Sequence, residues 1–145
     1  MNRILVSLFV LFSGFVLVSS CNKDKNATDP ALKEAQIAKE DSIFNLVMNV
    51  HDEVMPLTST LVKRIELLEE MEEMDSLQST LLSELKTGKE AMWDWMYAIK
   101  APKKLRDSLS HEKIVSYLVN EQASIDEVKR LMIEAKNNSE VLYEE

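Results

Sequence analysis

A stripe of apolar residues at alternating intervals of three and four is the feature that most constrains how this chain folds. This spacing is typical of one buried face of an α-helix in a bundle or coiled coil. The first stripe consists of Phe44, Val47, His51, Val54, Thr58, Leu61, Ile65 and Leu68. The second consists of Leu81, Leu85, Gly88, Met92, Trp95 and Ile99, and the third of His111, Ile114, Leu118, Ile125, Val128, Met132, Ala135 and Leu142. No segment alternates as a strand does, so the pattern predicts an all-α fold.

Residues that start and stop helices divide the chain into three long helices. The boundaries are Asp29-Pro30 and Asp75-Ser76 at two starts, Ala101-Pro102 at an end, and Ser108 or Ser110 at the third start. Short loops between amphipathic helices favour an antiparallel arrangement. We therefore expect an antiparallel bundle of three long helices over residues 30–145.

Two residues inside the predicted helices need a special explanation. Pro56 interrupts the first stripe, but the stripe keeps its phase, which predicts one helix over about 30–73 with a kink at the proline. A break there would instead give a four-helix bundle. Gly88 lies on the second stripe, where glycine costs about 1 kcal/mol relative to alanine. Its presence predicts a bulky neighbour, either Trp93, Trp95 or a facing side chain.

The first 21 residues have the features of an export signal. Arg3 precedes an apolar run from Ile4 to Val18, which is short for a bilayer span and typical of a secretory signal. The sequence Leu17-Val18-Ser19-Ser20-Cys21 then resembles a bacterial lipobox. That resemblance implies a signal peptide over 1–20, a cysteine carrying acyl chains such as palmitate, and a tether over 21–29. The alternative is an ordinary secretory signal followed by a free cysteine.

The resemblance to a lipobox also predicts where in the cell the protein lies. Asn22 follows the cysteine where the inner-membrane retention signal of enteric lipoproteins has aspartate, so we expect a lipid-anchored protein of the cell envelope, at the outer membrane. The formal net charge of −8 argues against a nucleic-acid partner, because phosphate binding needs clustered Lys and Arg.

Composition and motifs favour a binding or structural module over an enzyme. The chain has no Gly-rich phosphate loop, no HExxH sequence and no nucleophile elbow. We therefore expect no catalytic activity and no cofactor, with the membrane as one partner and a protein bound to the helix faces as another.

A metal or haem site is the alternative, because both histidines lie on apolar stripes. If the turns centre near residues 74 and 104, His51 lies level with Ala98 and Ile99, and these with His111. Met55 and Met96 then lie within a turn of the same layer. His and Met ligands suit copper or haem, which would make the protein an electron carrier or a metal chaperone. The other interpretation is that His51 hydrogen-bonds to an Asp, a Glu or Tyr97, that His111 is exposed in the first turn of its helix, and that Met fills gaps in the core.

Two charged segments complete the pattern. Acidic residues crowd the end of the first predicted helix, at Glu66, Glu69, Glu70, Glu72, Glu73 and Asp75. Such a run is usually a solvated face, and a basic partner or a divalent cation is the alternative. The basic residues Lys100, Lys103, Lys104 and Arg106 are interpreted as complementing a helix dipole, and attraction to anionic lipid headgroups is the alternative.

Two short motifs resemble a group of small uncharacterised Bacteroidota lipoproteins. They are His51-Asp52-Glu53-Val54-Met55-Pro56 and Met92-Trp93-Asp94-Trp95-Met96. Some of those proteins carry the label "viral A-type inclusion protein". The resemblance implies a lipoprotein with a helical domain and no assigned activity.

Overall fold

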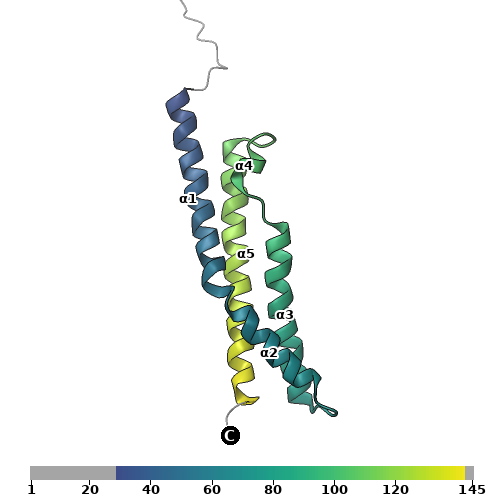
Figure 1. Ribbon diagram of the computed structural model, residues 1–145. Coiled ribbons are helices and arrows are strands. Elements are labelled where there is room, and N and C mark those ends of the chain that lie inside the picture. Colours follow the sequence, from purple (N-terminus) through teal and green to yellow (C-terminus); the bar gives the residue numbers. More distant parts are fainter. Residues whose placement is uncertain (1–28, 143–145) are drawn as a thin grey trace, which may run out of the picture.

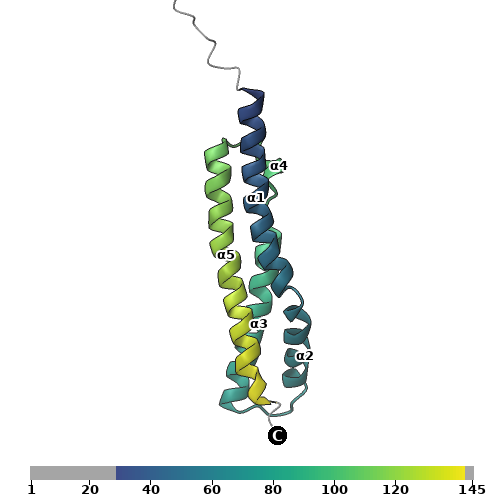
Figure 2. The same cartoon turned by 90° about the vertical axis from the view of Figure 1, so that its left-hand side faces the viewer.

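Every regular element in the structure is a helix. The computed structural model describes residues 29–142. The long helices are α1 (Pro30–Val54) continued by α2 (Leu57–Glu69), then α3 (Ser76–Ala98) and α5 (His111–Asn138). Between α3 and α5 lies the short α4 (Pro102–Leu105), and the 3-10 helix η1 (Ser139–Leu142) follows α5. The long helices run up and down beside one another (Figures 1 and 2), which confirms the predicted antiparallel three-helix fold.

Pro56 bends the first long helix by 38° instead of ending it. Proline has no N–H to donate to the preceding turn, and its ring crowds the carbonyl four residues back. The winding resumes at once, because the Met55 N–H reaches the His51 carbonyl at 2.8 Å and the Thr58 N–H reaches the Met55 carbonyl at 3.1 Å. Val54 and Thr58 are both buried, so the inner face continues across the bend. The predicted kinked helix is confirmed, although it ends at Glu69 and not near residue 73.

Two of the three predicted helix starts have the caps that their sequences indicate, whereas Ser110, the N-cap of α5, makes no side-chain cap hydrogen bond. The Asp29 carboxylate accepts the Ala31 N–H at 3.0 Å, and Pro30 occupies the first turn. At the start of α3 the Asp75 carboxylate accepts the Gln78 N–H at 2.7 Å, and the Gln78 side chain accepts the Asp75 N–H at 2.9 Å. This reciprocal pair is a capping box, which fixes where the chain turns back.

The core follows the three predicted stripes closely. Its fully buried members are Val47, Val54, Leu61, Leu68, Leu85, Met92, Ile114, Leu118, Ile125 and Met132. A smaller cluster of Leu105, Ile114 and Leu118 lies where α4 meets α5, with Phe44 of α1 packed against it. The phase of the stripes therefore determines which face of each helix is buried.

Gly88 lies where α3 packs tightly against α5 and against Leu61 of α2. A Cβ at this position would lie 3.3 Å from the Leu131 carbonyl oxygen, 3.3 Å from the Met132 Cα and 3.3 Å from the Leu61 Cδ2. The α5 backbone and Leu61 therefore take the space that a side chain would need. The facing element explains the glycine, and Trp93 and Trp95 do not.

Candidate functional site

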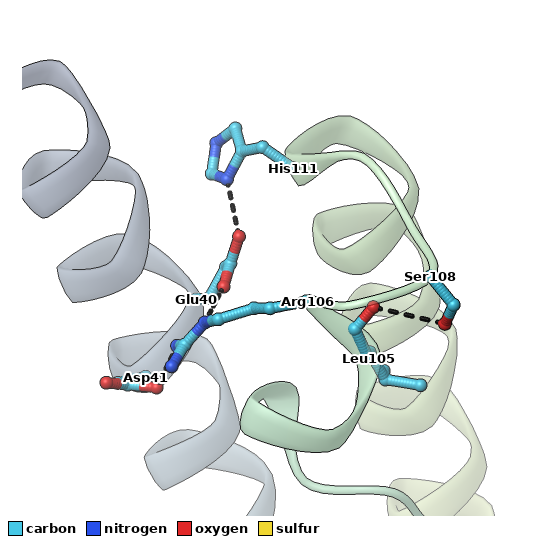
Figure 3. Close-up of polar contacts among 6 residues, drawn as sticks. All are labelled: Glu40, Asp41, Leu105, Arg106, Ser108 and His111. Atoms are coloured by element: carbon cyan, nitrogen blue, oxygen red, sulfur yellow. Dashed lines mark hydrogen bonds and ion pairs between the residues drawn. The ribbon is translucent and has the colours of Figure 1, made fainter. Parts of the chain in front are cut away.

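A buried polar cluster lies where α1 passes α4 and the start of α5. Glu40 is only 3% exposed, and both of its carboxylate oxygens are bound. Oε2 accepts from the Arg106 Nε at 2.7 Å, and Oε1 pairs with the His111 Nδ1 at 2.9 Å. The Arg106 guanidinium also binds Asp41 at 2.5 Å, so three elements meet around one carboxylate (Figure 3).

The segment between α3 and α5 brings these side chains together. α4 begins at Pro102 and ends at Leu105, and its C-cap is Arg106, whose N–H reaches the Pro102 carbonyl at 3.1 Å. The Tyr117 hydroxyl accepts the Lys100 N–H at 2.8 Å and holds the start of this connection against α5. Burial raises the pKa of Tyr117 above its usual range. The connection therefore has a fixed conformation, and Arg106 points toward α1.

The charges and hydrogen bonds of this cluster suit a structural contact between helices. The hydrogen bond to Glu40 is the main reason that the pKa of Arg106 is raised, so its guanidinium stays charged. Both oxygens of Glu40 are engaged, because one accepts from Arg106 and the other pairs with His111. Buried charges persist only when they are paired in this way. The arrangement joins α1 to the α4–α5 corner.

An open groove of about 430 Å³ runs beside this cluster. Its walls include Ile37, Leu109 and Ile114, which are apolar, and the cations Lys33 and Lys103. Asp107, Glu40, Arg106 and His111 also line it. The groove therefore mixes both signs of charge.

His51 occupies a different environment from His111. Its Nδ1 pairs with Asp52 at 2.8 Å, and its ring stacks on Trp95 with the centroids 5.7 Å apart and the planes at 28°. The His51 Nε2 and the Trp95 Nε1 are both buried without a hydrogen-bond partner. Two unpaired polar nitrogens in one contact are unusual, since buried polar atoms are nearly always bonded.

The two histidines do not share a layer, so the register predicted from the sequence is wrong in its second half. Glu53, two residues after His51, binds Lys129 at 2.6 Å. Lys129 lies 18 residues beyond His111, about 27 Å along α5 at 1.5 Å per residue. The reason is that residues 99–110 do not form a tight turn. They carry the chain past the end of α3, so α5 starts level with Glu40.

The remaining candidate residues are placed as follows. The Met55 sulfur accepts the Thr58 hydroxyl at 3.8 Å, and both Met55 and Met96 are partly buried against the main core. Among residues 29–142, no group of three or more His, Cys, Asp or Glu side chains is arranged to hold a metal ion. Cys21 lies outside the described residues.

The sequence contains a signal for Glu40 that lies outside the motifs described above. Glu40 precedes Phe44 and Val47 by four and seven residues, so it lies in phase with the first apolar stripe. A charged residue at such a position needs a partner in the fold. The partner is Arg106, which was interpreted above as complementing a helix dipole and which instead binds α1.

The contact between His51 and Trp95 leads to a prediction about stability. We expect His51→Phe to stabilise the protein by about 1 kcal/mol, because a phenyl ring keeps the stacking and removes a buried unpaired nitrogen. The melting temperature followed by circular dichroism should rise by roughly 4 °C. His51→Ala is the control and should lower it, because it also removes the ring. A lower melting temperature for His51→Phe would show that Nε2 has a partner that stabilises the fold.

Comparison with known proteins adds no family to this picture. No family model, no curated protein and no solved structure matches the chain.

Proposed function

We propose that this chain is a lipid-anchored, non-catalytic helical binding module of the bacterial cell envelope. The observation that carries the proposal is the sequence Leu17-Val18-Ser19-Ser20-Cys21 after an apolar run, with Cys21 as the only cysteine of the chain. Cys21 has no second cysteine in this sequence with which to form a disulfide, and acylation would account for it. Two or more acyl chains hold a protein firmly on a bilayer.

The fold fits such a role. The bundle starts at Pro30, nine residues after Cys21, so a short tether would connect the anchor to α1. Among the helices of residues 29–142, none has the length and apolarity needed to span a membrane. A rigid helical rod on a lipid tether offers long faces to a protein partner. We assign the protein to the outer membrane because Asn22, and not aspartate, follows Cys21.

Replacing the anchor residue tests the proposal directly. We expect Cys21→Ser to move the protein from the membrane fraction to the soluble fraction and to abolish incorporation of an alkyne-labelled palmitate. Asn22→Ser is the matched control, since it changes the adjacent residue and keeps the cysteine, and it should remain labelled and membrane-bound. Persistent membrane attachment of Cys21→Ser would contradict the proposal.

A further inference from the structure

Several apolar side chains are exposed at the end of the bundle farthest from Pro30. We call this end the distal tip; it comprises the last turn of α2, residues 70–75, the first turn of α3 and η1, which meet in both views (Figures 1 and 2). Its exposed apolar residues are Leu67, Met71, Met74, Leu77 and Val141. Single exposed apolar residues are ordinary, but a group of them in one place marks an interaction site.

The distal tip also contains a hollow of about 220 Å³. It is lined by Leu67, Leu68, Met71 and Leu142, which come from α2, the loop after it and η1. All four side chains are apolar, so the hollow suits one large apolar side chain of a partner. Methionine adapts its shape to such an anchor, because its side chain is unbranched and flexible.

Acidic residues outnumber basic ones around this apolar surface, although Lys63 and Arg64 lie beside Leu67. Glu66, Glu70, Glu72 and Glu73 form no ion pair within the part of the chain that the structure describes, whereas Glu69 binds Lys86 at 2.6 Å. The last turn of α2 contains no basic residue. Glu66 and Glu70 lie at the C-terminus of α2, where carboxylates oppose the helix dipole, so these two residues cost stability in the free protein. A cationic partner would reverse that cost.

We propose that the distal tip docks a basic amphipathic helix of a partner protein, with one apolar side chain in the hollow and lysine or arginine residues against the surrounding glutamates. A second copy of this chain fits poorly, because it would bring the same carboxylates together. The last residues of the chain fit poorly as well, since Glu144 and Glu145 are acidic. A basic helix complements both the apolar and the charged features of the tip.

This inference rests on the proposed function and gives the binding module a location for its partner. Residues 30–69 form one bent helical segment of roughly 60 Å at 1.5 Å per residue. The distal tip would therefore stand well away from the lipid to which Cys21 is anchored.

The test measures binding of a defined probe to the full chain in phosphatidylcholine nanodiscs. The probe is a fluorescent Leu/Lys peptide of about 18 residues with its leucines on one helical face. We expect it to bind, and Leu67→Ser/Met71→Ser to weaken binding about tenfold or more, since about 1.4 kcal/mol corresponds to each factor of ten. Both side chains are more than 40% exposed, so the variant should stay folded.

Two further variants test the contribution of the glutamates and whether binding is specific to the apolar residues of the distal tip. Glu70→Gln/Glu72→Gln/Glu73→Gln should also weaken binding and flatten its dependence on salt. Leu46→Ser/Val119→Ser removes apolar residues of α1 and α5 that are at least as exposed as Leu67 and Met71, and it should leave binding unchanged. If the distal-tip variants bind the probe as tightly as the wild-type chain, or if the wild-type chain does not bind it, the proposal is wrong.

Other possible occupants of the distal tip would give different results in these measurements. A dimer in sedimentation that Leu67→Ser/Met71→Ser abolishes would assign the tip to a second copy, and tighter probe binding after deletion of residues 143–145 would assign it to the chain itself. Either result overturns the proposal. Membrane attachment through Cys21 is measured separately, so failure of the anchor and failure of the docking surface are distinguishable.

Discussion

Replacing Gly88 with leucine should destabilise the bundle by about 3 kcal/mol or more, close to the upper range for overpacking. The Cβ alone would lie 3.3 Å from the Leu131 carbonyl oxygen and the Met132 Cα. Because these are backbone atoms of a long helix, they cannot move aside as a flexible side chain would. The remaining leucine atoms therefore force α3 and α5 apart. We expect the melting temperature to fall by roughly 10 °C or more.

Two controls separate crowding from other effects of the substitution. Gly88→Ala should change the stability by less than about 1 kcal/mol, because the gain in helix propensity offsets three tight contacts. Ala123→Leu places leucine at an exposed site on α5 and should be nearly neutral. Wild-type stability of Gly88→Leu in urea unfolding would mean that α3 and α5 do not approach closely at this point.

The fold was predictable because each helix carries its own local signals. Asp29 and Asp75 mark helix starts through their caps, and the apolar stripes assign the buried faces without knowledge of the neighbours. The register between the first long helix and α3 is also predicted to within one turn. The sequence places His51 level with Ala98 and Ile99, and in the structure the His51 ring stacks on Trp95. These features depend on residues close together in the sequence.

The register between α3 and α5 is not predictable from such local signals. A tight turn near residue 104 and an extended connection through α4 contain the same turn-forming residues. The choice between them depends on Arg106 meeting Glu40, a contact between residues 66 positions apart. His111 joins the same carboxylate, so the error in the connection also produced the error in the proposed His51–His111 layer.

Replacing Glu40 with alanine should cost about 2–3 kcal/mol, because it leaves the Arg106 guanidinium and the His111 ring without their shared carboxylate. Removing one partner of a fully buried ion pair costs roughly 3–5 kcal/mol, and partial exposure of both partners lowers that figure. Glu40→Gln should cost less, because the amide oxygen still accepts one hydrogen bond. Hydrogen exchange should speed up in the first turns of α1, which the cluster ties to α4.

The exposed pair between Glu53 and Lys129 supplies the matched control, because it also joins α1 to α5. Glu53→Gln should cost less than about 1 kcal/mol, as exposed ion pairs usually do. If Glu40→Ala is as mild as this control, the buried cluster does not hold α1 in place.

Replacing the whole cluster distinguishes a structural tie from a binding device. Exchanging every member of a buried ion pair for apolar residues is often neutral or stabilising, whereas removing one member is not. Glu40→Leu/Arg106→Met/His111→Phe should therefore recover most of the stability that Glu40→Ala loses. Since α1 is the helix that follows the proposed anchor, the triple variant should keep the orientation of the bundle and binding at the distal tip. Loss of probe binding in a stable triple variant would show that the cluster contributes to binding itself.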